Sequence, residues 1–458
     1  MKTFSLAAGP AAAIALGWSL WDAGDPQSPA QAWTAGVTLL CAAWWMFEPI
    51  PIPATSLLPL ALFPLAGVLT ADQVASAYGD KLILLLLGGL MLSTALQRSG
   101  AHRRLALSMV RAFGGRGGRG LVLGVMVAAA GLSMWISNMA TALMLLPIVT
   151  AVVEKTPDPK LRTALLLGMA YATSIGGIGT PVGTPPNLIF IDNYYHLTGI
   201  EIGFSRWMSW TVPIVLLMIP LAALWLTRGI APGQRIELPE TGPWRPVEVR
   251  TLAVFLATAL LWVTRSEPWG GWSAWCNLPE ANDATVALLA VVAMFLIPDG
   301  RGDRLLDWET AQRIPWGILI LFAGGVAISE AFAASGLSRQ LGVLLAGLAD
   351  LPVLPMIVVL CLGVTFLTEV TSNTATANLL MPILGAAAAA ARVDPLLFMA
   401  PAAISVSFAF MLPVATGPNA IVFGSPHVTV QDMAREGLVL NLIGVVVVAG
   451  LFSWRFVV

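Results

Sequence analysis

Two short polar stretches in an otherwise apolar chain carry the residue types that could bind a small charged ligand. Residues 368–378 read T-E-V-T-S-N-T-A-T-A-N, with apolar runs on both sides. Ser and Asn compete with the backbone for hydrogen bonds inside helices and favour N-caps, so we predict that a helix breaks at Ser372–Asn373 and restarts there. At membrane depth, such a break is tolerated where it is buried in protein or lines a cavity. Taken alone, the stretch also fits an unbroken spanning helix whose polar side chains form hydrogen bonds with a neighbouring helix.

The same pattern occurs earlier in the chain, which argues against the unbroken helix. Residues 133–148 read S-M-W-I-S-N-M-A-T-A-L-M-L-L-P-I, and Ser137 and Asn138 lie 235 residues before Ser372 and Asn373. Further landmarks match at offsets of 232 to 236 residues: the glycine pairs 88–89 and 324–325, the Ser-Gly pairs 99–100 and 335–336, and the loops P-V-G-T-P-P-N at 181–187 and P-V-A-T-G-P-N at 413–419. Landmarks in one order near a single offset indicate an internal duplication. Paired helix breaks in two halves of a membrane chain point to a transport site.

The composition predicts a polytopic helical membrane protein. The chain has 458 residues, of which 57% are hydrophobic and 11% are charged, and its mean hydropathy is +0.81. The net charge of −1 indicates no class of partner. The cysteines and histidines lie in separate segments, at Cys41, Cys276 and Cys361 and at His102, His196 and His427. This spacing argues against a disulfide framework, a cluster that binds a metal, and a nucleophile–base pair.

We expect eleven spans and two re-entrant hairpins. In residues 1–227 we place spans at 7–21, 32–47, 57–69 and 82–96, a basic surface helix at 98–120, a hairpin at 121–153, a broken helix from 161 with its loop at 176–187, and a span at 210–226. A cytoplasmic linker covers residues 228–250. In residues 251–458 we place spans at 252–263, 284–297 and 314–334, a surface helix at 336–348, a hairpin at 356–391, a broken helix at 395–412 with its loop at 413–419, and a span at 438–452. Residues 7–21 could instead form a signal peptide, but they lead straight into further membrane segments.

The distribution of positive charge sets the predicted orientation. This layout places 18 of the 24 lysines and arginines on the cytoplasmic side, as the positive-inside rule requires. It predicts a protein of the cell (inner) membrane with its amino end in the cytoplasm and its carboxyl end outside. The odd number of segments per half makes the halves inverted, so the two breaks meet near the midplane. The arginines between residues 98 and 119 suit a membrane surface, and we expect no nucleic-acid partner in so hydrophobic a chain.

The doubled S-N-x-A-T motif, the x-x-T-x-P-N loops and the turn at residues 48–53 resemble the divalent anion/sodium symporter family over nearly the whole chain. Members of this family take up dicarboxylates, citrate or sulfate. The resemblance implies a homodimer in which a transport domain moves like an elevator against a scaffold. It also implies Na⁺ as the coupling ion.

The residues themselves indicate the same class of substrate. Neither hairpin tip contains Lys or Arg, so an anion there would meet helix N-termini, where free N–H groups and the helix dipole favour negative charge. Two such ends suit a dianion. Each contributes about 0.3–2 kcal/mol, too little to desolvate a dianion without bound cations. Hydroxyl, amide and carbonyl oxygens are hard ligands that suit Na⁺.

The resemblance assigns roles to individual positions. The first sodium site would consist of Ser133, Ser137, Asn138 and the backbone of Gly183. The second would consist of Thr368, the backbone of Thr371, Ser372, Asn373 and the backbone of Ala415. Substrate contacts would come from Ser137, Asn138, Met139, Thr184, Ser372, Asn373, Thr374, Thr416 and Gly417.

Two of these positions depart from the family pattern, and three acidic residues need an explanation. Met139 stands where the family commonly has Thr, and Gly417 stands opposite Pro185 of the first half. Because Met139 lacks a donor and adds bulk, we expect a slim four-carbon dicarboxylate such as succinate to be favoured over citrate and sulfate. Glu369 is expected to support the second tip, with a direct role in ion binding as the alternative. Glu48 and Glu330 are expected to be packing or interface residues.

Other functional classes fit less well. The predicted spans contain no HExxH, GxSxG or paired aspartates, so we expect no enzyme. Two hairpins with oxygen-rich breaks make an occluding site and not the ring of a channel pore. The alternative that stays open is a sodium-independent or proton-coupled exchanger or permease for citrate, sulfate or another oxyanion.

Overall fold

The computed structural model of the chain describes residues 2–114, 117–230, 242–267, 269–337, 340 and 351–457. Within these ranges the fold is all-helical, apart from an isolated bridge between Pro298 and Arg304. The helices of the first half are α1 (Lys2–Leu20), α2 (Ser28–Phe47), α3 (Ile52–Thr55), α4 (Leu57–Leu65), α5 (Ala71–Tyr78), α6 (Lys81–Ser99), α7 (Ala101–Gly114), α8 (Gly117–Ser133), α9 (Asn138–Glu154), α10 (Pro159–Gly177), α11 (Pro185–Thr198) and α12 (Phe204–Leu226).

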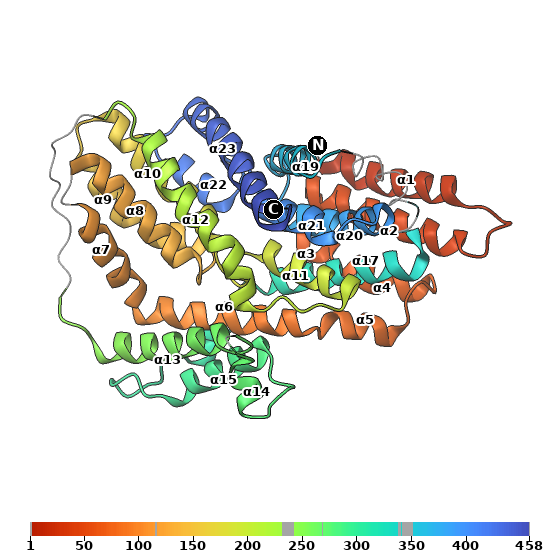
Figure 1. Cartoon of the computed structure of the whole chain (residues 1–458), viewed down its shortest axis with the longest axis horizontal. Coiled ribbons are helices and arrows are strands. Elements are labelled where there is room, and N and C mark those ends of the chain that lie inside the picture. The colour runs from red at the N-terminus through yellow and green to blue at the C-terminus, as the bar shows by residue number, and fades with distance from the viewer. Residues whose placement is uncertain are drawn as a thin grey trace.

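The second half follows a similar order of elements. Its helices are α13 (Pro246–Val263), α14 (Gly271–Trp275), α15 (Asp283–Leu296), α16 (Trp308–Ala311), α17 (Trp316–Ser335), α19 (Val353–Thr368), α20 (Asn373–Ala391), α21 (Pro395–Ser405), α22 (Gly417–Phe423) and α23 (Val430–Val457). Figure 1 shows α1 and α2 at one end of an elongated molecule, α7 to α10 at the other, and α13 to α15 along one side. Most of the surface helix expected at 336–348, and residues 231–241 of the linker, lie outside the described residues.

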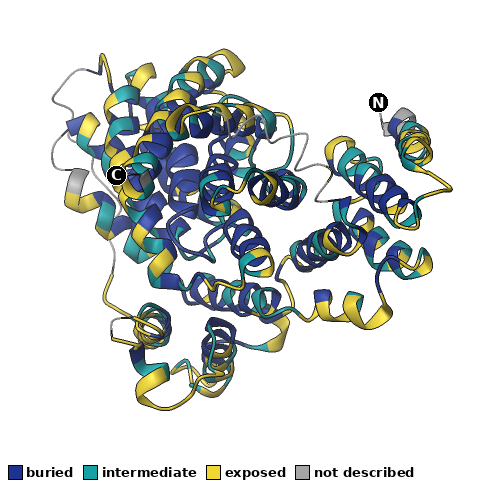
Figure 2. Cartoon of the chain, turned by 45° about the vertical axis from the view of Figure 1, so that its right-hand side comes forward, coloured by how far each residue is buried: buried dark blue, intermediate teal, exposed yellow. Residues whose placement is uncertain are grey.

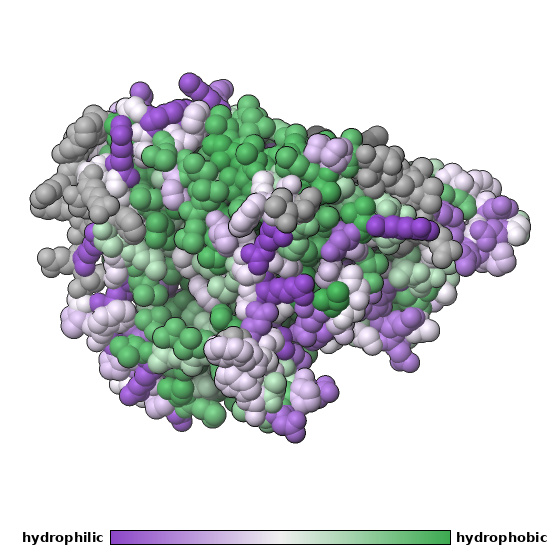
Figure 3. Space-filling view, in the orientation of Figure 1, coloured by the Kyte–Doolittle hydropathy of each residue, from purple (hydrophilic) through white to green (hydrophobic). Residues whose placement is uncertain are grey.

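Several of the helices are long and apolar enough to span a membrane. Within the described ranges these are six: Ala71–Ser99, Phe204–Leu226, Pro246–Val263, Trp316–Ser335, Asn373–Ala391 and Val430–Phe456. Apolar side chains cover the face over α12 and α23 (Figure 3). The helices at the centre of the molecule are mostly buried, whereas the helix next to the amino end has an exposed outer face (Figure 2). This distribution suits a protein whose outer surface meets lipid.

Matched landmarks in the two halves have matched local structure. α6 ends at Ser99 and α17 ends at Ser335, and each is followed by a glycine in the left-handed region, with φ of 78° at Gly100 and 73° at Gly336. In each case the serine hydroxyl accepts a hydrogen bond from a backbone N–H two residues further on. A glycine at these positions avoids the steric cost that a Cβ would carry.

Several expected boundaries differ from the structure; the span expected at 438–452, for example, lies within the longer α23, and the surface helix expected at 98–120 ends at Gly114 with α7. The span expected at 57–69 ends at Leu65, so α4 has 9 residues and a length of about 14 Å, which is shorter than a bilayer core of about 30 Å. The linker expected to reach residue 250 ends earlier, because Pro246 starts α13 with a fixed φ suited to the first helical turn. The helix expected at 395–412 ends at Ser405, and residues 406–416 form a non-helical connection with turns at 406–407 and 413–415 that leads to α22.

A buried ion network joins the loop before α12 to the start of α15. Arg265 donates from Nε to Asp283 at 2.6 Å and from Nη2 to Glu201 at 2.7 Å. The arginine is 6% exposed and Asp283 is 8% exposed. Because a buried charge that loses its partner is costly, this network ties the carboxyl ends of α11 and α13 to the amino end of α15.

Candidate functional site

The first polar stretch breaks a helix as its sequence predicts. α8 ends at Ser133, and α9 begins at Asn138 with Ser137 as its N-cap. The Ser137 hydroxyl accepts a hydrogen bond of 3.4 Å from the Ala140 N–H. Across the break, the Ser133 hydroxyl donates to the amide oxygen of Asn138 at 2.8 Å. Two side-chain oxygens therefore lie together beside a helix N-terminus.

The second polar stretch repeats this arrangement. α19 ends at Thr368, and α20 begins at Asn373 with Ser372 in the N-cap position. The Thr368 hydroxyl lies 2.7 Å from the amide oxygen of Asn373 and 3.1 Å from the carbonyl oxygen of Val406. The hydroxyls of Thr371 and Thr376 lie 2.6 Å apart. The second break thus gathers several oxygens around the first turn of α20.

In each half, an asparagine forms hydrogen bonds across the loop that interrupts the broken helix. Asn187 donates from its amide nitrogen to the carbonyls of Gly177 at 3.0 Å and Thr180 at 2.7 Å. In the second half, Asn419 donates to Ala409 and Leu412 at 3.0 Å each, and all three residues lie 232 positions further on. Both asparagines are fully buried, and among the described residues neither amide oxygen has a hydrogen-bond partner. The backbone carbonyls left free by each broken helix are therefore held in a fixed turn.

Close packing of glycines brings the first tip against the first loop. A Cβ on Gly177 would lie 2.5 Å from the amide oxygen of Asn138, and a Cβ on Gly183 would lie 2.3 Å from the Gly177 carbonyl oxygen and 3.1 Å from that of Met134. Only glycine leaves room for these approaches. Ser133, Asn138 and the loop at Gly183 are therefore brought together, and Gly177 joins them although its sequence context did not single it out.

Helices from different halves meet at the site. α9 of the first hairpin contacts α22 of the second half, and α20 of the second hairpin contacts α11 of the first half. The side chain of Met139 lies against Gly417, where an added Cβ would come within 2.7 Å of the Met139 Cε. The two positions that depart from the family pattern are thus in contact. The first tip therefore meets the loop helix of the second half, whereas a contact between α20 and α11 lies further along both helices, at Gly385 and Leu197.

Glu369 holds the second loop in place. Its carboxylate accepts hydrogen bonds from the backbone N–H groups of Met411 at 2.9 Å and Leu412 at 3.0 Å, and from the side chain of Asn441 at 2.7 Å. The amide oxygen of Asn441 in turn accepts from the Phe410 N–H at 3.3 Å. These bonds satisfy the backbone beyond Ser405, which explains why α21 ends earlier than expected. They also favour the supporting role for this glutamate.

The remaining predicted positions differ in their burial and in the hydrogen bonds that they make. Thr184 and Thr416 are the N-cap residues of α11 and α22, and the Thr416 hydroxyl accepts from the Asn419 N–H at 3.2 Å. Thr374 is half-buried in the first turn of α20. Ala415 donates its N–H to the Leu412 carbonyl at 3.2 Å, a hydrogen bond within the second loop. Buried Asn378, which donates to the Leu321 carbonyl and ties α20 to α17, was not singled out from the sequence.

The arrangement can bind a hard cation and an anion next to each other. Each tip presents a hydroxyl and an amide oxygen less than 3 Å apart, and such oxygens are the ligands that hard cations prefer. Each tip also starts a helix whose free N–H groups favour an anion. The site has the chemistry to bind a small anion together with cations, at a junction of helices from both halves.

Comparisons of the structure and the sequence with known proteins both indicate a transporter. The chain resembles two solved transporter structures in fold. The YdaH transporter of Alcanivorax borkumensis matches with a TM-score of 0.61 and 15% identity, and the match covers 92% of this chain and 99% of that one. MtrF of Neisseria gonorrhoeae matches with a TM-score of 0.59 and 15% identity, and the match covers 87% of this chain and 85% of that one. The protein is a membrane transporter, not an enzyme.

The family follows from the sequence comparisons. The family model described as the sodium:sulfate symporter transmembrane region matches residues 12–458, and the chain belongs to this family. The sodium-dependent dicarboxylate transporter SdcS of Staphylococcus saprophyticus is 38% identical over 449 residues, which cover 93% of this chain and 86% of that protein. SdcS of Staphylococcus aureus strain USA300 is 38% identical over 437 residues, with coverage of 90% and 83%. The resemblance drawn from the duplicated motifs is confirmed.

Proposed function

We propose that this protein is a sodium-coupled symporter that imports a C4-dicarboxylate such as succinate across the cell membrane. The observation that carries the proposal is the pair of matched oxygen clusters, Ser133 with Asn138 and Thr368 with Asn373, each beside the N-terminus of a helix. Relatives that are 38% identical are named sodium-dependent dicarboxylate transporters, which supports the choice of cation and substrate class.

The proposal assigns two sodium sites and a dianion between them. The first Na⁺ binds Ser133, Ser137, Asn138 and the backbone at Gly183. The second binds Thr368, Ser372, Asn373 and the backbone at Thr371 and Ala415. The carboxylates of the substrate meet the first turns of α9 and α20, with Thr184 and Thr416 from the loops. In each cluster the hydroxyl keeps its proton but turns it away from the amide oxygen, so that both oxygens can bind the cation.

The proposal also includes the architecture inferred from the sequence. Residues 1–227 and 251–458 form two inverted halves around eleven spans and two re-entrant hairpins, with the linker at 228–250 in the cytoplasm. The amino end lies inside and the carboxyl end outside. The protein acts as a homodimer in which the domain that carries both tips moves like an elevator. The contacts of α9 with α22 and of α20 with α11 support one moving unit that contains both sites.

Transport by purified protein in liposomes tests the proposal. We expect uptake of labelled succinate to require an inward sodium gradient and to fall to background when choline replaces sodium. Uptake that ignores sodium but requires dianion inside the liposomes would support an exchanger, and uptake driven by a pH gradient alone would support proton coupling. Either result would contradict the symporter.

The contact between Met139 and Gly417 leads to a prediction on affinity and selectivity. Met139 cannot donate a hydrogen bond, whereas a hydroxyl donated to a carboxylate contributes about 1.5–3 kcal/mol. We therefore expect Met139→Thr to tighten succinate binding by about tenfold or more, since each step of about 1.4 kcal/mol corresponds to tenfold, and Thr374→Met to weaken it. Competition of labelled succinate by citrate, sulfate and malate measures the selectivity. Citrate that competes as well as succinate in the wild type would contradict a narrow site.

A double-mutant cycle provides the matched control for this prediction. Gly417→Ala should weaken succinate binding in the wild-type background, because the new Cβ would lie 2.7 Å from the Met139 Cε and displace that side chain. In the Met139→Thr background the same change should have little effect. Additive effects would show that the two positions act separately.

A further inference from the structure

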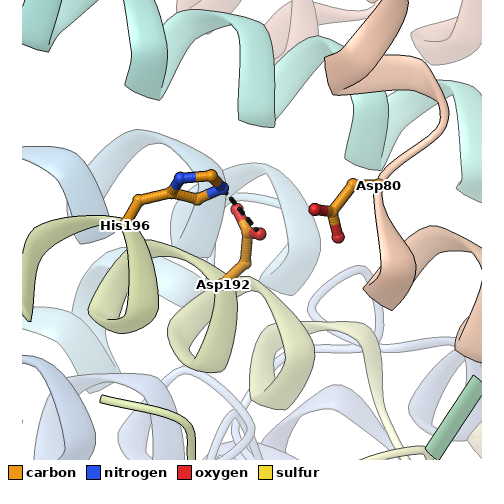
Figure 4. Close-up of side chains that lie close together, drawn as sticks. All are labelled: Asp80, Asp192 and His196. Atoms are coloured by element: carbon orange, nitrogen blue, oxygen red, sulfur yellow. Dashed lines mark ion pairs between the residues drawn. The ribbon is translucent and has the colours of Figure 1, made fainter. Parts of the chain in front are cut away.

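A cluster of titratable side chains lies apart from the proposed sodium and substrate sites. It consists of Asp80, which precedes α6, and of Asp192 and His196 on α11. One ligand atom from each residue lies within 4.8 Å of the other two. In Figure 4 the carboxylate of Asp192 lies between the imidazole of His196 and the carboxylate of Asp80. The scattered histidines predicted no metal cluster, and the prediction missed this group because its two carboxylates come from separate segments.

One oxygen of this cluster is buried and lacks a partner. Asp192 is 1% exposed, and its Oδ1 lies 3.4 Å from the His196 Nε2. Among the described residues, the second carboxylate oxygen of Asp192 accepts no hydrogen bond, although it is buried. A buried carboxylate oxygen without a partner is costly, and a bound cation would satisfy it.

The surroundings favour a cation that can arrive from water. The His196 side chain is 40% exposed. It lines a cavity of about 430 Å³ together with Asn193, Ser329, Glu330, Met381 and Gly385. Glu330 adds a further carboxylate, whose Oε2 is buried and without a partner among the described residues. The nearby ammonium of Lys81 is directed over the ring of Tyr195, 3.7 Å from its centroid. Three carboxylates around one imidazole make the local electrostatic potential negative, which favours a cation.

We propose that Asp80, Asp192 and His196 bind a divalent transition metal of the Zn²⁺ type. An imidazole nitrogen with two carboxylate oxygens is a ligand set that suits Zn²⁺, whereas Mg²⁺ and Ca²⁺ prefer oxygen ligands alone. Three protein ligands leave the fourth tetrahedral position to water or to Glu330 from the cavity side. The exposed edge of His196 is the route of entry.

The bound metal would connect two parts of the structure that are otherwise in slight contact. α11 begins next to the loop with Thr184 and carries Asp192 about two turns further on, whereas Asp80 caps α6 by accepting from the Leu82 N–H at 2.6 Å. A metal that binds both helices therefore restrains the helix that leaves the substrate loop. We infer that Zn²⁺ inhibits transport from this site. This second step rests on the proposed function, because it requires α11 to move during transport.

Binding is tested first, without any transport measurement. Purified protein in detergent is titrated with Zn²⁺ by calorimetry and by competition with a chelating dye, with Mg²⁺ as the control cation. We expect one Zn²⁺ per chain, and an increase in Kd of at least about 100-fold for His196→Gln and for Asp80→Asn, because loss of outer-shell partners alone costs about 10- to 100-fold. Asp80→Asn is chosen because Asn caps a helix as well as Asp does, so α6 should stay intact.

A matched histidine variant separates this site from incidental binding. His427→Gln removes a histidine that is outside the cluster and whose carbonyl accepts from Thr163 of α10, so it should leave Zn²⁺ affinity unchanged. The absence of saturable Zn²⁺ binding, or unchanged binding by both His196→Gln and Asp80→Asn, would overturn the site. In liposomes we expect Zn²⁺ to inhibit succinate uptake by the wild type and by His427→Gln, but not by His196→Gln. Equal inhibition of all three proteins would show that Zn²⁺ does not inhibit transport by restraining α11 from this site. Uptake without sodium would contradict the proposed function but would not affect the Zn²⁺-binding result.

Discussion

Asn138→Ala and Asn373→Ala should each abolish sodium-driven dianion uptake while the chain remains folded. Each asparagine presents its amide oxygen to a hydroxyl at 2.7 to 2.8 Å and starts a helix at its tip. Alanine removes an oxygen that the proposed cation needs, and no basic side chain at the tips can balance the dianion instead. The variants are measured by succinate uptake over a range of sodium concentrations, with folding followed by thermal unfolding in detergent.

Two further variants make this result specific. Asn138→Asp retains an oxygen at the same position and should retain sodium dependence, with an altered apparent affinity for sodium. Asn282→Ala removes an asparagine that caps α15 by accepting from the Thr285 N–H at 3.0 Å, so it should cost about 1 kcal/mol of stability without loss of uptake. Wild-type sodium dependence in either Asn138→Ala or Asn373→Ala would show that the sodium ligands are assigned wrongly.

The helix breaks could be predicted from the sequence because their causes are local. Ser137 caps α9 with its hydroxyl, whereas Ser372 occupies the N-cap position of α20 without a side-chain cap hydrogen bond; in both cases the residue type favours the end of a helix. Gly100 and Gly336 end α6 and α17 for the same kind of reason, since a left-handed residue after a helix favours glycine. Because these signals recur in the same order in both halves, the family can be recognised from the sequence alone.

The parts that could not be predicted depend on contacts between distant segments. The early end of α21 follows from hydrogen bonds that Glu369 and Asn441 make with residues 410–412, and neither partner is near α21 in sequence. The spacing of Asp192 and His196, four residues apart, placed both on one face of a helix and could have been recognised. The approach of Asp80 to them depends on how α6 packs, which no local pattern encodes.

Removal of the Glu369 carboxylate should have the second large effect. Glu369→Ala leaves three donors without their acceptor, namely the N–H groups of Met411 and Leu412 and the amide of Asn441. Hydrogen bonds to a charged group contribute about 1.5–3 kcal/mol each, so we expect a marked drop in unfolding temperature and a loss of uptake. Glu369→Gln should be milder, because one oxygen still accepts while the new NH₂ group opposes one donor.

The dependence on sodium distinguishes support of the loop from direct ion binding by Glu369. If the carboxylate holds the loop, Glu369→Gln should lower the unfolding temperature and the rate of uptake but leave the apparent affinity for sodium unchanged. Asn441→Ala, which removes one donor from the same network, should act in the same direction. An increase of about tenfold or more in the sodium concentration for half-maximal uptake, corresponding to about 1.4 kcal/mol, without a change in unfolding temperature would assign Glu369 to the ion site instead. The three hydrogen bonds already made by this carboxylate occupy most of its roughly four lone-pair sites and leave little capacity for a cation, which is why we expect the first result.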